Sequence, residues 1–278
     1  MGIGQYQLLL NKGVHPYEIP ALSLGKGIPK DIHQTYSSWD NLKPEWKENI
    51  EKMSRLNPDW IYHFYDDAAV EQFILNEYGE PILALYQRIN PKIGPARADL
   101  FRYLLMYKKG GVYLDIKSTI TQPLNATLLP EDQFILSHWS QMPNREKELS
   151  RFPLGEYIQW AIVCALGHPF LKAVIDTVLG NLLVYNPWLH GIGKRAALRV
   201  TGPFAYTFAI DAVKDRFPHR YIRQMEDMGI HYSLYTLNKP DENVMAHEKN
   251  FPNHYSQNRE LLITHHSFTH SLYKRMRK

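Results

Sequence analysis

The chain has 278 residues, 44% of them hydrophobic and 22% charged, with a formal net charge of +4 and a single cysteine. This composition is typical of a globular protein with a sizeable core, and it excludes a fold held together by internal disulfides. The basic residues are scattered except at 274–278, and no nucleic-acid-binding motif accompanies them, so we expect no nucleic-acid partner. No apolar run has the length of a membrane span.

The first part of the chain alternates predicted strands and helices. The elements expected here are, in order, a loose lead-in over 1–26, a strand over 28–36, a helix over 43–56, a strand over 60–65, a helix beginning at 66–67 and a helix over 81–89. The first helix is predicted from Trp46, Ile50 and Met53, which recur at helical spacing. Asp66 is expected to cap the second helix, because a carboxylate accepts a hydrogen bond from a first-turn backbone amide.

The stretch from residue 96 to residue 118 is the most informative part of the chain. It begins as a predicted amphipathic helix. The apolar stripe of this helix consists of Leu100, Tyr103, Leu104 and Tyr107. Asp99 and Arg102 are three residues apart, so we expect them to lie together on the helix surface. The pair Gly110-Gly111 is expected to end the helix, because glycine readily adopts the backbone of a C-terminal cap.

A strand is predicted directly after this glycine pair. Because side chains alternate along a strand, Tyr113, Asp115 and Lys117 should share one face. A carboxylate and an ammonium group then emerge side by side at the end of a strand, where open α/β sheets bind their ligands. Taken alone, an Asp-x-Lys sequence is more often a solvated surface ion pair than part of a site.

The second part of the chain predicts further strands and several helices. The elements expected here are a strand over 133–137, an apolar helix over 157–166, helices over 170–183 and 204–217, and strands over 230–235 and 261–265. Cys164 falls within the apolar helix and is expected to be a buried, unreactive thiol. The alternation predicts an α/β fold with a mostly parallel sheet and helical additions after residue 150. No repeat or linker divides the chain, so we expect a single domain over 1–278.

The segment 96–118 closely resembles the signature of glycosyltransferase family 32. This family contains the yeast initiating α-1,6-mannosyltransferase and many bacterial capsule and lipopolysaccharide enzymes, and it is more distantly similar to the clostridial glucosylating toxins. A second match is Ile-His-Gln-Thr at residues 32–35. The resemblance implies the Rossmann-like GT-A fold of nucleotide-sugar transferases, with a donor-binding half over 27–150, an acceptor-side half over 151–270 and a basic tail over 271–278.

The resemblance also implies roles for individual residues. Asp99 and Arg102 match the family's pair that holds the donor sugar and ribose, and they are expected to form the catalytic group together with Asp115 and Lys117. The donor-binding residues implied in this way are Gln34, Thr35, Tyr36, Arg97, Asp99, Arg102, Tyr113, Asp115 and Lys117. The residues implied on the acceptor side or in the sugar pocket are Gln159 and Thr201. Core packing of Gln159 and an ordinary turn at Thr201 are the structural alternatives.

The resemblance fails at one position of the strand end. Family members carry Asp-x-Asp there and bind the donor through a divalent metal, whereas this chain has Asp115 followed by Lys117. A metal site for Mn²⁺ or Mg²⁺ formed by Asp115 and His266 is one option. The other is that the lysine ammonium stabilises the departing phosphates itself, since fixed positive charge at that point is a large aid to transfer. The substitution makes a metal requirement doubtful.

The resemblance therefore implies a retaining hexosyltransferase that moves a hexose from a UDP- or GDP-sugar to a glycan or lipid-linked glycan in surface polysaccharide or lipopolysaccharide synthesis. Two alternatives stay open, namely a toxin-like transferase that modifies proteins and a non-catalytic nucleotide-sugar- or glycan-binding relative disabled at Lys117. We expect a cytoplasmic location. Contact between the basic tail and an anionic surface of the inner membrane would make the protein peripheral to it.

Overall fold

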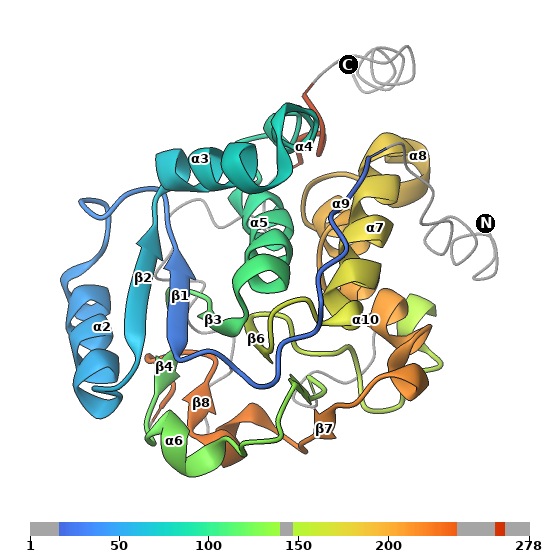
Figure 1. Ribbon diagram of the computed structural model, residues 1–278. Coiled ribbons are helices and arrows are strands. Elements are labelled where there is room, and N and C mark those ends of the chain that lie inside the picture. The colour runs from blue at the N-terminus through green and yellow to red at the C-terminus, as the bar shows by residue number, and fades with distance from the viewer. Residues whose placement is uncertain (1–16, 140–146, 238–258, 265–278) are drawn as a thin grey trace.

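A computed structural model describes residues 17–139, 147–237 and 259–264 (Figure 1). Within these residues, six strands form one sheet in the order β2-β1-β3-β6-β5-β7, and two more form a separate ribbon. The sheet strands are β1 (Asp31–Thr35), β2 (Ile61–Tyr65), β3 (Gly111–Leu114), β5 (Phe134–Leu136), β6 (Ala161–Cys164) and β7 (Arg220–Tyr221), and the ribbon consists of β4 (Thr119–Ile120) and β8 (Ile230–His231). In this sheet β6 alone runs antiparallel to its neighbours. The predicted α/β class with a mostly parallel sheet is confirmed.

Helices cover both faces of the sheet. The α-helices are α2 (Pro44–Leu56), α3 (Asp67–Tyr78), α4 (Glu80–Gln87), α5 (Gly94–Lys109), α6 (Leu124–Thr127), α7 (Pro169–Leu183), α8 (Pro187–His190), α9 (Gly193–Val200) and α10 (Pro203–Asp211), and the 3-10 helices are η1 (Lys147–Leu149), η2 (Lys214–Arg216) and η3 (Met225–Met228). No helix among the described residues is both long and apolar enough to cross a membrane.

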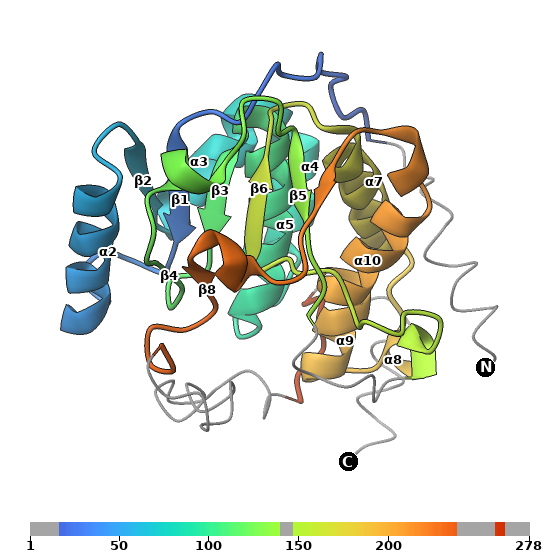
Figure 2. The ribbon, with the colours of Figure 1, turned by 90° about the horizontal axis from the view of Figure 1, so that it is seen from below.

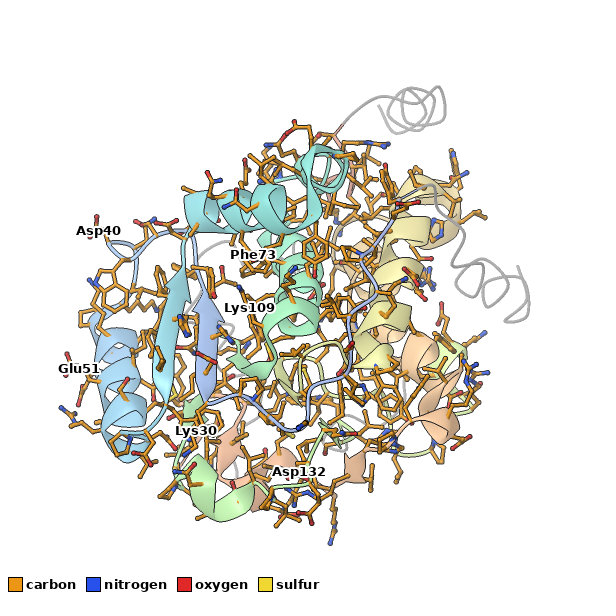
Figure 3. All side chains as sticks on the ribbon, viewed as in Figure 1. Lys30, Asp40, Glu51, Phe73, Lys109 and Asp132 are labelled. Carbon is orange, nitrogen blue, oxygen red and sulfur yellow. The ribbon has the colours of Figure 1, made fainter. Side chains whose placement is uncertain are left out.

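Alternation along the strands divides the interior into two cores. Val112 and Leu114 of β3 pack with α2, η3 and β8, whereas Tyr113 between them packs with α5 and α7. Figure 2 shows the result, with the strands lying between α5 on one side and the η3–β8 segment on the other. Helix α2 presents its outer face to solvent, where Glu51 points away from the sheet (Figure 3).

Helix α5 is buried almost all round, which corrects the expected amphipathic helix. Every residue from Asp99 to Tyr107 is buried, including Asp99 and Arg102, which were expected on its surface. The reason is its position between the sheet and the neighbouring helices α3 and α7, whose apolar residues share one core with it. A helix buried on all sides has no solvent-exposed face, so it does not need a polar stripe opposite its apolar one.

The glycine pair after α5 allows the chain to turn directly into β3. Gly110 and Gly111 have φ angles of 69° and 92°. A Cβ atom on Gly111 would lie 2.5 Å from the carbonyl oxygen of Asp31 in β1. The pair therefore combines a backbone conformation that favours glycine with a close approach of two strands. This geometry fixes where β3 starts and where its far end lies.

The apolar helix expected over 157–166 is wrong, because residues Ala161–Cys164 form strand β6. This strand is buried on both faces, so its sequence is a continuous apolar run without the alternation that marks a half-exposed strand. Cys164 is nevertheless buried as expected, and burial raises the pKa of its thiol.

Several smaller expectations also change. The strand expected over 230–235 is limited to β8, and the strand expected over 261–265 is an isolated bridge between Ile263 and Ile89 among the described residues. Residues 184–202, for which no element was predicted, contain α8 and α9. The helices predicted over 43–56, 81–89 and 170–183 are confirmed within two residues at each end.

Candidate functional site

One edge of the sheet collects the polar residues singled out in the sequence. Strands β1, β2 and β3 are parallel and end at this edge. Because β6 runs the opposite way, the residues just before it, Gln159 and Trp160, lie at the same edge. The backbone amide of Asp115 donates to the carbonyl oxygen of Trp160 over 2.9 Å, which joins the two segments.

Four charged side chains form a continuous ion-pair chain at this edge. Arg102 Nη2 lies 3.4 Å from Asp99 Oδ1 and 3.1 Å from Asp115 Oδ1. Lys117 Nζ lies 2.9 Å from the other oxygen of Asp115. The side chains of Asp99 and Arg102 are only 6% and 4% exposed, whereas those of Asp115 and Lys117 are 22% and 11% exposed. The ion-pair chain thus runs from the deeply buried Asp99 and Arg102 to the less deeply buried Asp115 and Lys117.

Residues from the second half of the protein hold the buried end of this chain. Thr201 Oγ1 donates to Asp99 Oδ2 over 3.0 Å. Arg102 Nη1 donates to the side-chain and backbone oxygens of Gln159 over 2.8 and 2.9 Å. The Tyr103 hydroxyl donates to the carbonyl oxygen of Thr201 and to Gln159 Oε1. The structure therefore brings Gln159 and Thr201 together with Asp99 and Arg102.

Burial and neighbouring charges change the pKa values of the two buried members of the ion-pair chain, Asp99 and Arg102. Burial raises the pKa of Asp99 to about 6, although Arg102 and the hydrogen bond from Thr201 favour the ionised carboxylate. For Arg102, burial disfavours the charged guanidinium, but Asp115, Tyr113 and Asp99 outweigh it and raise the pKa further. Arg102 is therefore a permanent cation beside Asp115.

Asp115 and Lys117 lie on a turn, which corrects the expected strand position. Strand β3 ends at Leu114, and the amide of Ser118 donates to the carbonyl oxygen of Asp115 over 2.8 Å. The two side chains still meet, as the alternation argument predicted, and the Asp115 side chain also forms a hydrogen bond with Tyr113. Lys117 Nζ lies 4.2 Å from the centre of the Tyr232 ring, a cation–π contact.

Gln34, one of the implied donor-binding residues, forms hydrogen bonds within the protein through both ends of its side-chain amide. Its side chain is fully buried, and Nε2 donates to the carbonyl oxygen of Asp115 over 3.1 Å. Its Oε1 atom accepts from the hydroxyl of Tyr62 over 3.1 Å. Both ends of the amide are thus used inside the protein, and Gln34 holds the turn that carries Asp115.

Of the remaining implied donor residues, Thr35 and Tyr36 lie at the end of β1, whereas Arg97 lies away from the ion-pair chain. Tyr36 is half-buried after β1 with its ring edge-on to Trp46, and the hydroxyl of Thr35 donates to the carbonyl oxygen of Tyr65. The structure does not bring Arg97 to the ion-pair chain. Its guanidinium donates to the carbonyl oxygens of Ile89 and Gln87, between α4 and α5.

The described residues do not fit a divalent cation at Asp115. Both carboxylate oxygens already lie beside a cationic nitrogen, Oδ1 beside Arg102 and Oδ2 beside Lys117. No group of three or more His, Cys, Asp or Glu side chains that could hold a metal ion occurs in the part of the chain that the structure describes. His266, the second ligand considered, lies outside the described residues.

Two residues contribute to the site without having been predicted to do so from the sequence. Tyr103 was expected in the apolar stripe of the helix, but its hydroxyl joins Gln159 to Thr201. Tyr232 comes from the loop after β8 and covers Lys117. Neither residue has a sequence pattern that distinguishes it from a core aromatic, because both contacts join segments far apart in the chain.

Comparison with known proteins agrees with the resemblance noted in the sequence. Residues 43–135 match the family described as "Glycosyltransferase sugar-binding region containing DXD motif". This range contains α5, β3 and the four charged residues of the ion-pair chain, Asp99, Arg102, Asp115 and Lys117. The resemblance of segment 96–118 is confirmed.

The relatives are named for mannosyl transfer. The chain is 34% identical to mannosyl phosphorylinositol ceramide synthase SUR1 of Saccharomyces cerevisiae, over 43% of this chain and 30% of that protein. It is 34% identical to inositol phosphoceramide mannosyltransferase 2 of Schizosaccharomyces pombe, over 69% and 49%. It is 28% identical to the initiation-specific alpha-1,6-mannosyltransferase of Candida albicans, over 55% and 43%. In each of these three comparisons, the aligned region spans less than half of the relative's length.

One solved structure resembles the protein over most of its length. It is titled "PaToxG Glycosyltransferase" and matches with a TM-score of 0.49 and 16% sequence identity, covering 77% of each chain.

Proposed function

We propose that this chain, whose residues 43–135 carry the sugar-binding region of a glycosyltransferase family, is a retaining hexosyltransferase that uses a nucleotide sugar. The observation that supports this most directly is the ion-pair chain Asp99–Arg102–Asp115–Lys117. It lies within the family-matched segment, at the sheet edge where α/β proteins bind ligands. If these ion pairs only stabilised the fold, their two most exposed members, Asp115 and Lys117, would have no reason to lie at the edge of the sheet where ligands bind.

In the proposed reaction, the bond between the anomeric carbon and the donor's phosphate oxygen breaks, and its electron pair leaves with the nucleoside diphosphate. The acceptor oxygen bonds to the anomeric carbon on the same face, and its proton passes to the departing phosphate oxygen. Positive charge fixed near that oxygen lowers the barrier. Lys117 and Arg102 supply such charge at this edge of the sheet.

The carboxylates are proposed to orient the donor. Asp115 is the most exposed member of the chain and is held by Arg102, Lys117 and Tyr113, so its position is fixed before the donor arrives. Asp99 and Arg102 form the inner wall, where the resemblance implies contacts with the sugar and ribose hydroxyls. Charge-assisted hydrogen bonds of this kind are directional and about twice as strong as neutral ones.

The names of the relatives favour mannose as the hexose, and therefore GDP-mannose as the first donor to test, with UDP-hexoses as the alternative. They also favour a glycolipid head group or a glycan as the acceptor. A role in surface polysaccharide or lipopolysaccharide synthesis rests on the resemblance alone, since the relatives quoted are named for mannosyl transfer in yeasts. Contact of the basic residues 274–278 with an anionic membrane surface, and a cytoplasmic location, are further parts of the proposal.

A thermal-shift screen of GDP- and UDP-sugars, followed by turnover of whichever binds, tests the proposal. Binding to the folded protein at one hundred times Kd adds roughly 2.7 kcal/mol of apparent stability, which is readily measured. We expect one nucleotide sugar to raise the melting temperature and to be consumed, with slow hydrolysis in the absence of acceptor. Binding without any turnover would support the non-catalytic alternative. No shift with any nucleotide sugar would refute the proposed function.

A further inference from the structure

We infer that this site binds the diphosphate of its donor through the ammonium group of Lys117, without a divalent cation between Asp115 and the phosphates. This inference rests on the proposed function and names the counter-ion that the site supplies. It departs from the Asp-x-Asp arrangement after which the family is described.

The first observation is that the carboxylate of Asp115 is already neutralised on both sides. Its Oδ1 atom lies 3.1 Å from Arg102 Nη2, and its Oδ2 atom lies 2.9 Å from Lys117 Nζ. A divalent cation bound to either oxygen would lie within a few ångströms of a fixed positive charge, and like charges at that distance in a partly buried site repel strongly.

The second observation is that Lys117 is held in place rather than extended into solvent. The ring of Tyr232 covers its ammonium group at 4.2 Å, and the amide of Leu234 donates to its carbonyl oxygen over 2.9 Å. The neighbouring residue Ser118 is held too, because the side-chain amide of Asn49 donates to its carbonyl oxygen over 2.9 Å. A lysine with little freedom left to lose gives more net binding energy to a ligand.

The third observation concerns hydrogen-bonding capacity. An ammonium group has three N–H donors, and the bond to Asp115 uses one of them. The side chain of Lys117 keeps 11% of its surface exposed, at the same edge as the 22% exposed Asp115. A phosphate oxygen can therefore accept from Nζ while the pair with Asp115 stays intact. In this arrangement Asp115 positions the ammonium group instead of binding a metal.

Calorimetric titration of the nucleotide sugar found in the screen tests this inference, in parallel in EDTA and in Mn²⁺. The variants are Lys117→Ala, Lys117→Asp and Lys109→Ala. Lys109, labelled in Figure 3, is the matched control, because it is half-exposed and pairs with Glu77. It precedes β3, whereas Lys117 follows that strand.

We expect the wild type to bind the donor equally in EDTA and in Mn²⁺. Lys117→Ala should bind about tenfold to a hundredfold more weakly in both, the usual effect of losing one hydrogen bond to a charged group. Lys117→Asp should bind measurably only with Mn²⁺, and Lys109→Ala should behave as the wild type.

Two results would overturn the inference and leave the proposed function standing. One is wild-type binding that disappears in EDTA and returns with Mn²⁺, and the other is undiminished binding by Lys117→Ala. Circular dichroism of each variant checks that it is folded. If Lys117→Ala does not fold, the wild-type comparison between EDTA and Mn²⁺ decides alone. Failure of every nucleotide sugar to bind the wild type in either condition would overturn the proposed function itself.

Discussion

Arg102 is the centre of the ion-pair chain, and its two carboxylate partners differ in how much they depend on it. Asp115 has a second cation in Lys117, whereas Asp99 has Arg102 and the hydroxyl of Thr201. The spacing of Asp99 and Arg102 correctly predicts that they meet. It does not reveal their burial, which decides what happens when either is removed.

Removing Asp99 should therefore affect folding as well as function. In Asp99→Ala, the hydroxyl of Thr201 loses an acceptor and Arg102 loses one of two counter-ions in a buried site. Breaking a buried ion pair costs about 3 kcal/mol of unfolding free energy or more. We expect a lower urea midpoint with an unchanged slope, together with on the order of a hundredfold loss of sugar transfer.

Two further variants separate these effects. Asp99→Asn keeps an acceptor for Thr201, so it should recover part of the stability and little of the activity. Asp215→Ala is the surface control, because its side chain is 86% exposed, and it should change the unfolding free energy by less than about 0.5 kcal/mol. An Asp99→Ala protein as stable as this control would contradict the buried position described here.

At the scale of single elements, the stability of the protein should depend strongly on the glycine pair between α5 and β3. Gly111→Ala would place a Cβ 2.5 Å from the carbonyl oxygen of Asp31, at a φ angle of 92°. We expect a loss of about 2 kcal/mol or more in unfolding free energy, measured in urea, because both the backbone and the neighbouring strand must move. Gly94→Ala is the control, since a Cβ there meets nothing within 4 Å. It should be neutral or stabilising, and equal losses in the two variants would contradict this account.

The cap of helix α7 makes the stability of the protein depend on pH. Nδ1 of His168 accepts a hydrogen bond from the amide of Phe170 over 3.2 Å, so the ring is neutral in the folded state. Burial, and then the nearby His219, lower the pKa of His168 to about 4, although its hydrogen bond to Pro218 opposes this. The unfolded chain binds a proton near pH 6.5 and the folded chain does not. Stability from this residue is therefore complete above pH 6.5 and is lost as the pH falls towards 4.

We expect His168→Asn to weaken this acid dependence. Asparagine can still accept from Phe170 but does not titrate, so the loss of unfolding free energy between pH 7 and pH 5 should shrink by about 2 kcal/mol. Urea unfolding at the two pH values measures it. Burial also lowers the pKa of His33 to about 4. A His33→Gln variant should therefore remove a further part of the loss of unfolding free energy between pH 7 and pH 5. A pH dependence identical to that of the wild type would contradict the role assigned to His168.

The elements that could be predicted best from the sequence are those with a pattern of apolar or capping residues within the element itself. Helix α2 shows periodic apolar residues, and α3 is capped by Asp66, whose carboxylate accepts a hydrogen bond from the backbone amide of Ala69 as predicted. Strand β6 was mistaken for a helix because burial on both faces removes the alternation. The two-residue strands β4 and β7 are too short to show any period, and only pairing with distant segments defines them.

Within the site, too, only the contacts between residues close in sequence could be predicted. Asp115 and Lys117 are two residues apart, so a local argument placed their side chains together, and it did so even though the strand ends earlier than expected. The bonds from Gln159 and Thr201 to the buried end of the chain depend on how the two halves pack, which no local spacing determines. The same limit applies to the hydrogen bonds that Gln34 forms with Asp115 and Tyr62, which join segments far apart in the sequence.

At the scale of the whole molecule, the division at residue 150 separates parts that share one interior. The larger core contains Phe101 of α5 together with Val174 of α7 and Ile210 of α10. Strand β3 pairs with β6 across the same division, from Gly111 with Cys164 to Leu114 with Ala161. The buried end of the ion-pair chain is completed by Gln159 and Thr201. The parts before and after residue 150 therefore pack as one structure, with a shared core and a shared sheet.

We accordingly predict that the protein unfolds in one cooperative step and that residues 27–150 do not fold alone. Without β6 and α7, the strand β3 would lose a hydrogen-bonded neighbour and the apolar surface of α5 would face water, a cost that no remaining segment offsets. Urea unfolding followed by near-ultraviolet and far-ultraviolet circular dichroism should give coincident midpoints, which is the standard sign of a two-state transition. The isolated fragment should lack a near-ultraviolet signal. Two separate transitions, or a fragment with ordered aromatic side chains, would show that the first half is a domain in its own right and that the ion-pair chain assembles between two domains.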